Sequence, residues 1–135
     1  MFRHHATPPA ARARLLRRVA RLARARQLLV VVAGRGARAD GVHGHMHGHG
    51  VRTWPAHDRR EALAGVRAHA DALFVSPIFA TRSHPGAPAI GAQGAIRIGR
   101  GVNIPLIALG GMTSGRWRKL RRLGFHGWAA IDAWL

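Results

Sequence analysis

The sequence lacks cysteine altogether and contains only five acidic residues in 135 positions. Without cysteine, neither a disulfide framework nor a thiolate metal site can form, and the redox compartment cannot be inferred from cysteine usage. No run of about 18 apolar residues occurs, which excludes an ordinary transmembrane helix, and the N-terminus has no unbroken apolar core of a secretory signal. We therefore expect a cytoplasmic protein without a membrane partner.

Because acids are scarce, the 22 lysine and arginine residues leave a formal net charge of +17. A charge of this size attracts polyanions, so a basic nucleic-acid binder is one alternative. However, Lys119 is the only lysine, and a GC-rich coding sequence produces the same bias toward Arg, Ala and Gly. Aromatic residues for base stacking are few, and no nucleic-acid-binding motif is present. We do not expect specific nucleic-acid binding.

Apolar runs and amphipathic stretches alternate along the chain, which predicts an α/β protein with parallel strands. In the first helix, Leu15, Val19, Leu22 and Ala23 share one face. Functional side chains in such folds lie at the carboxyl ends of the strands. The expected strands span residues 28–33, 40–43, 51–54, 71–76, 104–109 and 128–131, and the expected helices span residues 7–26, 58–70, 92–98 and 113–123.

Two segments of different character follow from this pattern: a basic amphipathic helix in residues 1–27 and an α/β domain in residues 28–135. An arginine-rich, acid-free amphipathic N-terminus is also typical of an organellar transit peptide. Here, however, the helix leads directly into a strand.

Three segments together resemble the thiamine phosphate synthase and TenI family. They are DGVH at Asp40–His43, ALFVSPIFATRSHPGAP at Ala72–Pro88 and IPLIALGGM at Ile104–Met112, and LGFHGWAAID at Leu123–Asp132 is similar to the family's closing strand. The resemblance covers Leu28 to Leu135.

The resemblance implies a (β/α)8 barrel that joins hydroxymethylpyrimidine pyrophosphate to thiazole phosphate and releases pyrophosphate with the help of Mg²⁺. A closed barrel needs about 200 to 250 residues, and the family's first two strands have no counterpart here. We therefore expect an incomplete barrel with about six parallel strands, whose unpaired edges a homo-oligomer would cover.

Family roles are carried over to matching positions. Thr81 corresponds to a threonine that contacts the pyrimidine pyrophosphate, and His84 and His57 stand at two further catalytic positions. Four positions match the thiazole-phosphate site: Gly110, Gly111, Ile131 and Asp132. The glycines suit close backbone approach to a phosphate.

Other positions depart from the family. Ala33-Gly34 replaces an Asn-Asp pair whose aspartate binds Mg²⁺, and no second aspartate follows DGVH. Since Mg²⁺ prefers oxygen ligands, its usual site is lost. The alternatives are a thiazole tautomerase of the TenI type, an impaired synthase, or a phosphate-binding or metal-binding barrel remnant without catalysis.

The segment after DGVH is rich in histidine: His43, His45, His47 and His49 alternate with other residues. In an extended segment these imidazoles would share one face, and imidazole is a common ligand for zinc, nickel or copper. No carboxylate or cysteine completes the set, so adventitious metal affinity is the expectation.

Overall fold

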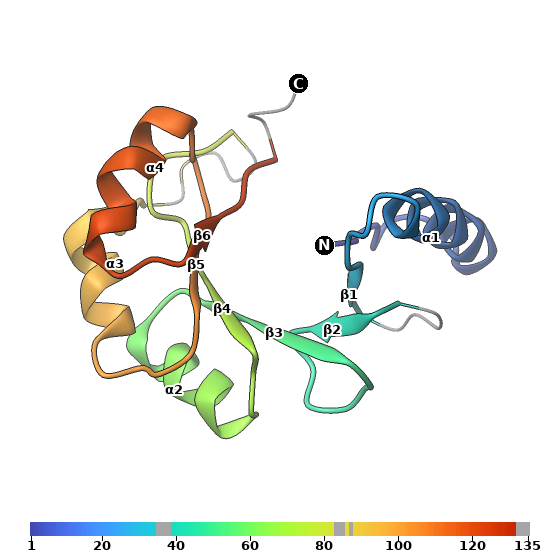
Figure 1. The fold of residues 1–135 in the computed structure, drawn as a ribbon, viewed down its shortest axis with the longest axis horizontal. Helices are drawn as coiled ribbons and strands as arrows, with labels where there is room; N and C mark the ends of the chain where they lie inside the picture. The colour runs from blue at the N-terminus through green and yellow to red at the C-terminus, as the bar shows by residue number, and fades with distance from the viewer. Residues whose placement is uncertain (35–38, 83–85, 87, 132–135) are drawn as a thin grey trace. The chain divides into compact units, whose positions relative to one another are not determined.

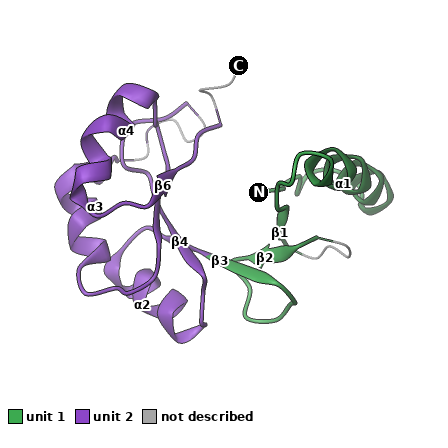
Figure 2. Ribbon diagram, in the orientation of Figure 1, with its two compact units in different colours: residues 1–53 green, residues 54–135 purple. Residues whose placement is uncertain are grey.

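The computed structural model of the chain describes residues 1–34, 39–82, 86 and 88–131 (Figure 1). The chain divides into two compact units: unit 1 is Met1–Thr53 and unit 2 is Trp54–Leu135 (Figure 2). The boundary expected between residues 1–27 and 28–135 lies inside unit 1, and that division stays a prediction.

Short strands alternate with helices along the described chain. The helices are α1 (Pro9–Arg24), α2 (Arg59–Arg67), α3 (Gly91–Gly99), α4 (Ser114–Leu120) and the 3₁₀ helix η1 (Arg121–Leu123). The strands are β1 (Val31–Ala33), β2 (Gly41–His43), β3 (Val51–Ala56), β4 (Ala72–Val75), β5 (Leu106–Ala108) and β6 (Gly127–Trp128). Among these described helices, none has the length and apolar character needed to cross a membrane.

The six strands form one sheet in chain order, β1-β2-β3-β4-β5-β6. The described pairings are parallel, as in β1 with β2 and β4 with β5. The predicted α/β class with six parallel strands is therefore confirmed. Parallel neighbours usually need a crossover of a dozen or more residues, yet no helix lies between β2 and β3, where the chain returns through residues 44–50.

The N-terminus adds a pairing that the sequence pattern did not predict. Phe2 forms a parallel bridge with Val32 of β1: the Phe2 N–H donates to Val31 O at 2.8 Å, and the Ala33 N–H donates to Phe2 O at 2.9 Å. Phe2, α1 and β1 therefore make a small parallel β-α-β unit. One residue thus pairs at the outer edge of β1, where a preceding strand would lie.

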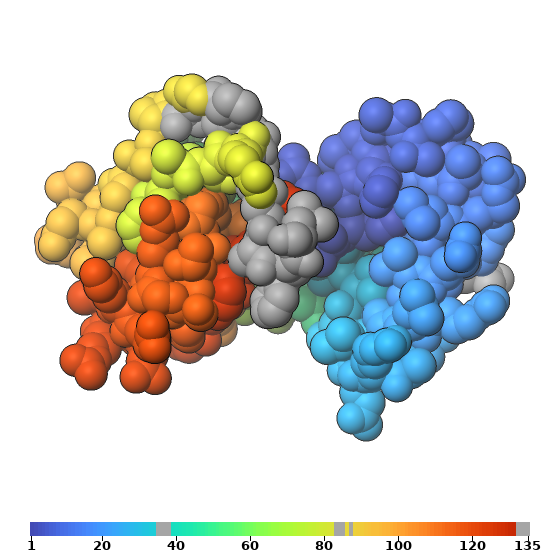
Figure 3. Space-filling view, turned by 90° about the horizontal axis from the view of Figure 1, so that it is seen from above, coloured from blue at the N-terminus to red at the C-terminus, as the bar shows by residue number. Residues whose placement is uncertain are grey.

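Helix α1 packs on β1 through most of the predicted face, with Leu16 in place of Leu22. Leu16 is its buried residue, and it forms a small core with Phe2, Val30 and Val32, which Leu15, Val19 and Ala23 flank. Leu22 was expected on this face but is 60% exposed. Arginines cover the rest of α1, whose side chains form part of the blue surface in Figure 3.

Unit 2 has the larger core, built between its strands and helices. Leu73 and Val75 of β4 and Ala108 of β5 are fully buried, and Ile78 and Leu120 close the core from the loop after β4 and from α4. This packing fixes the carboxyl ends of β4 and β5 next to each other.

Two strand boundaries differ from those expected. The first strand begins at Val31 and not at Leu28, and Leu28 and Leu29, which are 59% and 67% exposed, lie between the turn after α1 and the strand. The last strand is Gly127–Trp128 and not residues 128–131, although the Ala129 N–H still donates to Ala108 O at 2.8 Å. The apolar run of each segment extends beyond its paired part.

Helices α1 and α2 end in the same way. After α1, Gln27 has a φ of 55° and the Leu28 N–H donates to Ala23 O at 2.9 Å. After α2, His69 has a φ of 52° and the Ala70 N–H donates to Gly65 O at 3.0 Å. Both are Schellman-type ends, in which glycine is the usual left-handed residue.

Candidate functional site

The carboxyl ends of β4 and β5 lie together in unit 2 and bring two predicted segments into contact. The loop after β4 runs along the turn after β5, since the Ile78 N–H donates to Leu109 O at 3.0 Å and the Phe79 N–H donates to Gly110 O at 3.1 Å. The segment that leads to Thr81 therefore runs beside the Gly110-Gly111 turn, and the role of Thr81 stays a prediction.

Gly110 and Gly111 have conformations and surroundings that exclude a side chain. Their φ angles are +91° and +58°. A methyl group on Gly110 would lie 2.7 Å from Pro77 Cα, and one on Gly111 would lie 2.4 Å from Ala80 O. The two glycines are needed for the loop to approach this closely.

The backbone N–H groups of Gly110 and Gly111 are candidates for binding a ligand. Among the described residues, neither the Gly110 nor the Gly111 N–H donates a hydrogen bond. Neighbouring amides that point into one concavity are a common way of binding phosphate. At the start of α4, one backbone donor is already bound, because Thr113 Oγ1 accepts a hydrogen bond from the Arg116 N–H at 3.2 Å.

Arg116 is a residue of this site that the sequence interpretation missed. Its guanidinium lies 4.5 Å from the centre of the Phe79 ring and donates to Gly111 O. One arginine of α4 thus joins the turn to the loop after β4. Its position three residues after the capping Thr113 was the sequence signal available, but the many arginines of the chain obscured it.

The remaining predicted phosphate residues are only partly described. Ile131 is 59% exposed beyond the end of β6. His84 and Asp132 lie outside the described residues. Their roles stay predictions.

His57 stands directly after β3, at the start of α2, and is bound to Glu61. Its backbone N–H donates to Glu61 Oε2 at 2.7 Å, and its Nδ1 lies 2.7 Å from the same oxygen. Asp58 caps α2 by accepting from the Glu61 N–H at 2.8 Å. These bonds give His57 a role in starting the helix, and its catalytic role stays a prediction.

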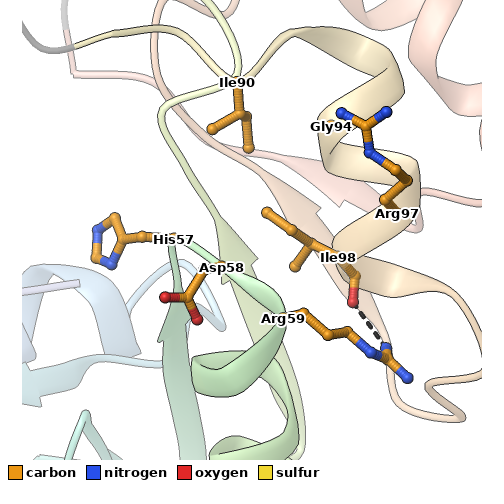
Figure 4. Close-up of a pocket in the computed structure, with 7 residues that line it drawn as sticks. All are labelled: His57, Asp58, Arg59, Ile90, Gly94, Arg97 and Ile98. Atoms are coloured by element: carbon orange, nitrogen blue, oxygen red, sulfur yellow. Dashed lines mark hydrogen bonds between the residues drawn. The ribbon is translucent and has the colours of Figure 1, made fainter.

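A shallow cavity of about 360 Å³ lies between the start of α2 and one face of α3 (Figure 4). Arg59 crosses it and donates to Ile98 O at 2.9 Å, whereas His57 points away from α3. Thr81, Gly110 and Gly111 are not among its lining residues. This cavity is therefore separate from the candidate phosphate turn.

The histidine-rich segment is not extended, contrary to the condition under which its imidazoles would share a face. It turns at Gly44, Gly48 and Gly50, all with positive φ. His43 Nδ1 lies 2.9 Å from Thr53 Oγ1, and His45 Nε2 accepts from the Gly34 N–H at 3.1 Å. Within the described chain, no group of three or more His, Cys, Asp or Glu side chains is placed to hold a metal ion.

The family model for thiamine monophosphate synthase matches residues 46–134. The chain belongs to the thiamine monophosphate synthase family. It is 43% identical over 79 residues to thiamine-phosphate synthase of Chloroflexus aurantiacus, a match that covers 58% of this chain and 37% of the relative.

A second relative is the putative thiamine-phosphate synthase 2 of Aquifex aeolicus, 39% identical over 83 residues, with 59% of this chain and 43% of the relative covered. The matched segments therefore cover less than half the length of these two relatives. The solved structure of thiamine phosphate pyrophosphorylase from Pyrococcus furiosus superposes on 96% of this chain and 69% of its own, with a TM-score of 0.81 and 23% identity. This likeness confirms the fold.

Members of the synthase family generally use Mg²⁺, but the described residues do not fit this ion. Asp40 Oδ2 accepts from the Val30 N–H at 2.8 Å, Asp58 caps α2, and Glu61 binds His57. These carboxylates belong to three local structures, and none joins a group of potential metal ligands within the part of the chain that is described. We derive no catalytic step through Mg²⁺.

Proposed function

We propose that the chain catalyses thiamine phosphate formation from hydroxymethylpyrimidine pyrophosphate and thiazole phosphate. The observation that supports this most is the pair of undonated N–H groups at Gly110 and Gly111, beside the loop that carries Thr81. Two undonated amides and the segment leading to the Thr81 hydroxyl lie at the carboxyl ends of β4 and β5, which supports phosphate binding there. Both substrates of the family are phosphorylated, and phosphate groups accept hydrogen bonds from N–H groups of this kind.

In the proposed reaction, the bond between the pyrimidine's methylene carbon and the pyrophosphate oxygen breaks, and its electron pair leaves with pyrophosphate. The thiazole nitrogen then uses its lone pair to form the new C–N bond. The protein's contribution is to orient two anionic substrates and to stabilise the departing charge. Thr81 and His84 act at the pyrimidine pyrophosphate, and Gly110, Gly111 and the backbone of Ile131 and Asp132 hold the thiazole phosphate.

A non-catalytic phosphate-binding remnant is the second candidate. It is favoured by the engagement of the Asp40, Asp58 and Glu61 carboxylates in separate local contacts, with no grouping of potential metal ligands among the described residues. Thiazole tautomerisation, pairing of open strand edges in a homo-oligomer, and a cytoplasmic location also stay predictions.

The test is to incubate the protein with both substrates and to follow thiamine phosphate by mass spectrometry. Thr81→Ala and His84→Ala are each expected to lower the rate by about tenfold or more, since each removes a polar contact to a reacting anion. Thr7→Ala, which loses the same hydroxyl far along the chain from the site, is the matched control and should retain the wild-type rate.

Folded protein that forms no product would exclude the synthase proposal. Thiazole phosphate binding by that same protein would then identify the remnant. Equal loss of rate in Thr81→Ala and Thr7→Ala would instead remove Thr81 from the site.

A further inference from the structure

Three large apolar side chains are exposed where α1 ends and the chain continues toward β1. Leu22, in the last turn of α1, is 60% exposed, and Leu28 and Leu29, which follow the helix, are 59% and 67% exposed. We call these three residues the leucine patch. Single exposed leucines are ordinary on a protein surface, but several at one place, surrounded by polar residues, commonly mark a binding surface.

The end of α1 brings the leucine patch together. The Leu28 N–H donates to Ala23 O at 2.9 Å across the left-handed Gln27. In a Schellman end, the residue after the left-handed position commonly contacts an apolar side chain in the last turn of the helix. Leu22 holds that place, directly before the acceptor Ala23. Leu29 follows Leu28 in the chain, so all three leucines lie at one end of the helix.

Exposed arginines surround the leucine patch. Four of them recur at spacings of three and four residues and therefore share one face of α1: Arg14, Arg17, Arg18 and Arg21. Arg18 lies one turn before Leu22, and Arg26 Nη1 donates to Leu22 O at 3.4 Å. No acidic residue occurs in residues 1–39. The apolar surface is therefore bordered by positive charge without a carboxylate from its own segment.

This combination fits an anionic bilayer better than a nucleic acid. Leucine offers no hydrogen bond to a phosphate or a base, but it is stabilised when it leaves water for an apolar phase. Arginines beside an inserted apolar group place their methylene stems in the apolar region and their guanidinium groups at the lipid phosphates. A nucleic acid would bind the arginines and leave the leucine patch in water.

We propose that the carboxyl end of α1 docks on an anionic phospholipid bilayer. The leucine patch enters the boundary between headgroups and acyl chains, and the exposed arginines bind lipid phosphates. Leu16 stays packed with Phe2, Val30 and Val32, so unit 1 docks in its folded form.

Surface docking needs no helix that crosses the bilayer. It departs from the expectation of a protein without a membrane partner, which was based on the lack of long apolar runs. The inference goes beyond the proposed catalytic function and does not depend on it.

Co-sedimentation of the full chain with large unilamellar vesicles tests the proposal at about 0.15 M NaCl. Vesicles of equimolar phosphatidylcholine and phosphatidylglycerol should bind the protein about tenfold or more tightly than vesicles of phosphatidylcholine alone, because several arginines lie near the anionic surface. Leu28→Gln/Leu29→Gln should weaken binding to the anionic vesicles by about tenfold or more, because two leucines no longer leave water.

Leu63→Gln/Val66→Gln is the matched control. It replaces two apolar side chains of α2 that are 38% and 39% exposed, in a helix outside unit 1. This variant should bind the anionic vesicles within about twofold of wild type, because exposed apolar residues outside the patch do not enter the lipid. Circular dichroism checks the fold of each variant, and Leu29→Gln alone provides a milder second variant of the patch.

Binding to a short DNA duplex separates apolar insertion from positive charge. A net charge of +17 favours salt-dependent association with any duplex. Leu28→Gln/Leu29→Gln should leave duplex binding within about twofold of wild type, because phosphate contacts do not involve leucine. Arg14→Gln/Arg17→Gln/Arg18→Gln should weaken binding to both the duplex and the anionic vesicles.

Anionic vesicle binding that is the same in the leucine variant and the control would overturn the proposal and leave only attraction between opposite charges. Failure to bind these vesicles, with duplex binding retained, would also overturn it and would identify a basic nucleic-acid binder. Equal binding to neutral and anionic vesicles would remove the arginines from the docking surface and overturn it as stated. Vesicle binding needs no substrate, so its failure leaves the proposed function intact, and protein that forms no thiamine phosphate leaves this inference intact.

Discussion

Gly110 combines two separate constraints at one residue. Its φ of +91° lies in the left-handed region, and its Cα faces Pro77, so a side chain would meet both a backbone penalty and a steric one. Gly124 has a similar φ of +86° but no heavy atom within 4 Å of an added methyl group. A comparison of Gly110 with Gly124 therefore separates conformational strain from close packing.

We expect Gly110→Ala to lower the free energy of unfolding by about 2 to 4 kcal/mol, since it adds overpacking to the cost of the left-handed conformation. Gly124→Ala should cost about 1 kcal/mol, from conformation alone. Urea denaturation followed by circular dichroism measures both. Equal losses of unfolding free energy in the two variants would show that close packing of the loop after β4 against Gly110 adds no cost.

Residue-level features of the site were predictable to different degrees. The Gly110-Gly111 pair marks its turn through local chemistry, because only glycine fits such a backbone without strain. The contact of Arg116 with Phe79 was not predictable from local chemistry, since it joins two side chains that are distant in sequence. The position of Arg116 three residues after Thr113 is its one local signal, and the many other arginines of the chain obscure it.

At the scale of elements, the sequence predicted the helices whose ends are marked by a capping residue or a glycine. Thr113 and Gly124 bound the last helical segment as expected, with Thr113 capping α4 and Gly124 in the left-handed conformation after η1. Leu22 and Leu28 misled the prediction, because apolar character alone does not show which side chains are buried. The bridge of Phe2 with β1 involves one residue and leaves no periodic pattern.

The ends of α1 and α2 yield a prediction of increased stability. Gln27 and His69 hold the left-handed positions that glycine usually occupies in a Schellman end. Gln27→Gly and His69→Gly should each raise the free energy of unfolding by about 0.5 to 1 kcal/mol, because the Cβ penalty disappears.

Gln27→Ala and His69→Ala are the matched controls, since alanine removes the same polar side chain but keeps its Cβ. Thermal unfolding of all four variants gives the comparison, and the alanine variants should gain nothing. A similar gain from alanine and glycine would mean that the side chain, and not the backbone, limits stability at these ends.

At the scale of the whole molecule, charge is the dominant unbalanced property. The formal net charge of +17 is distributed over 135 residues with only five acids to offset it. Repulsion among like charges destabilises a compact state. His57 Nδ1 lies 2.7 Å from Glu61 Oε2, and with five acids against 22 basic residues attractive pairs can offset only a small part of the repulsion.

Salt should therefore stabilise this protein. Raising NaCl from low concentration to about 0.5 M shortens the Debye length to under about 5 Å, and we expect the midpoint of thermal unfolding to rise. Arg14→Gln/Arg17→Gln/Arg18→Gln, on the exposed side of α1, lowers the charge from +17 by three, to +14. Its midpoint should be higher at low salt and should rise less with NaCl, because less repulsion remains to be screened. A midpoint that falls with salt would show that attractive pairs outweigh repulsion.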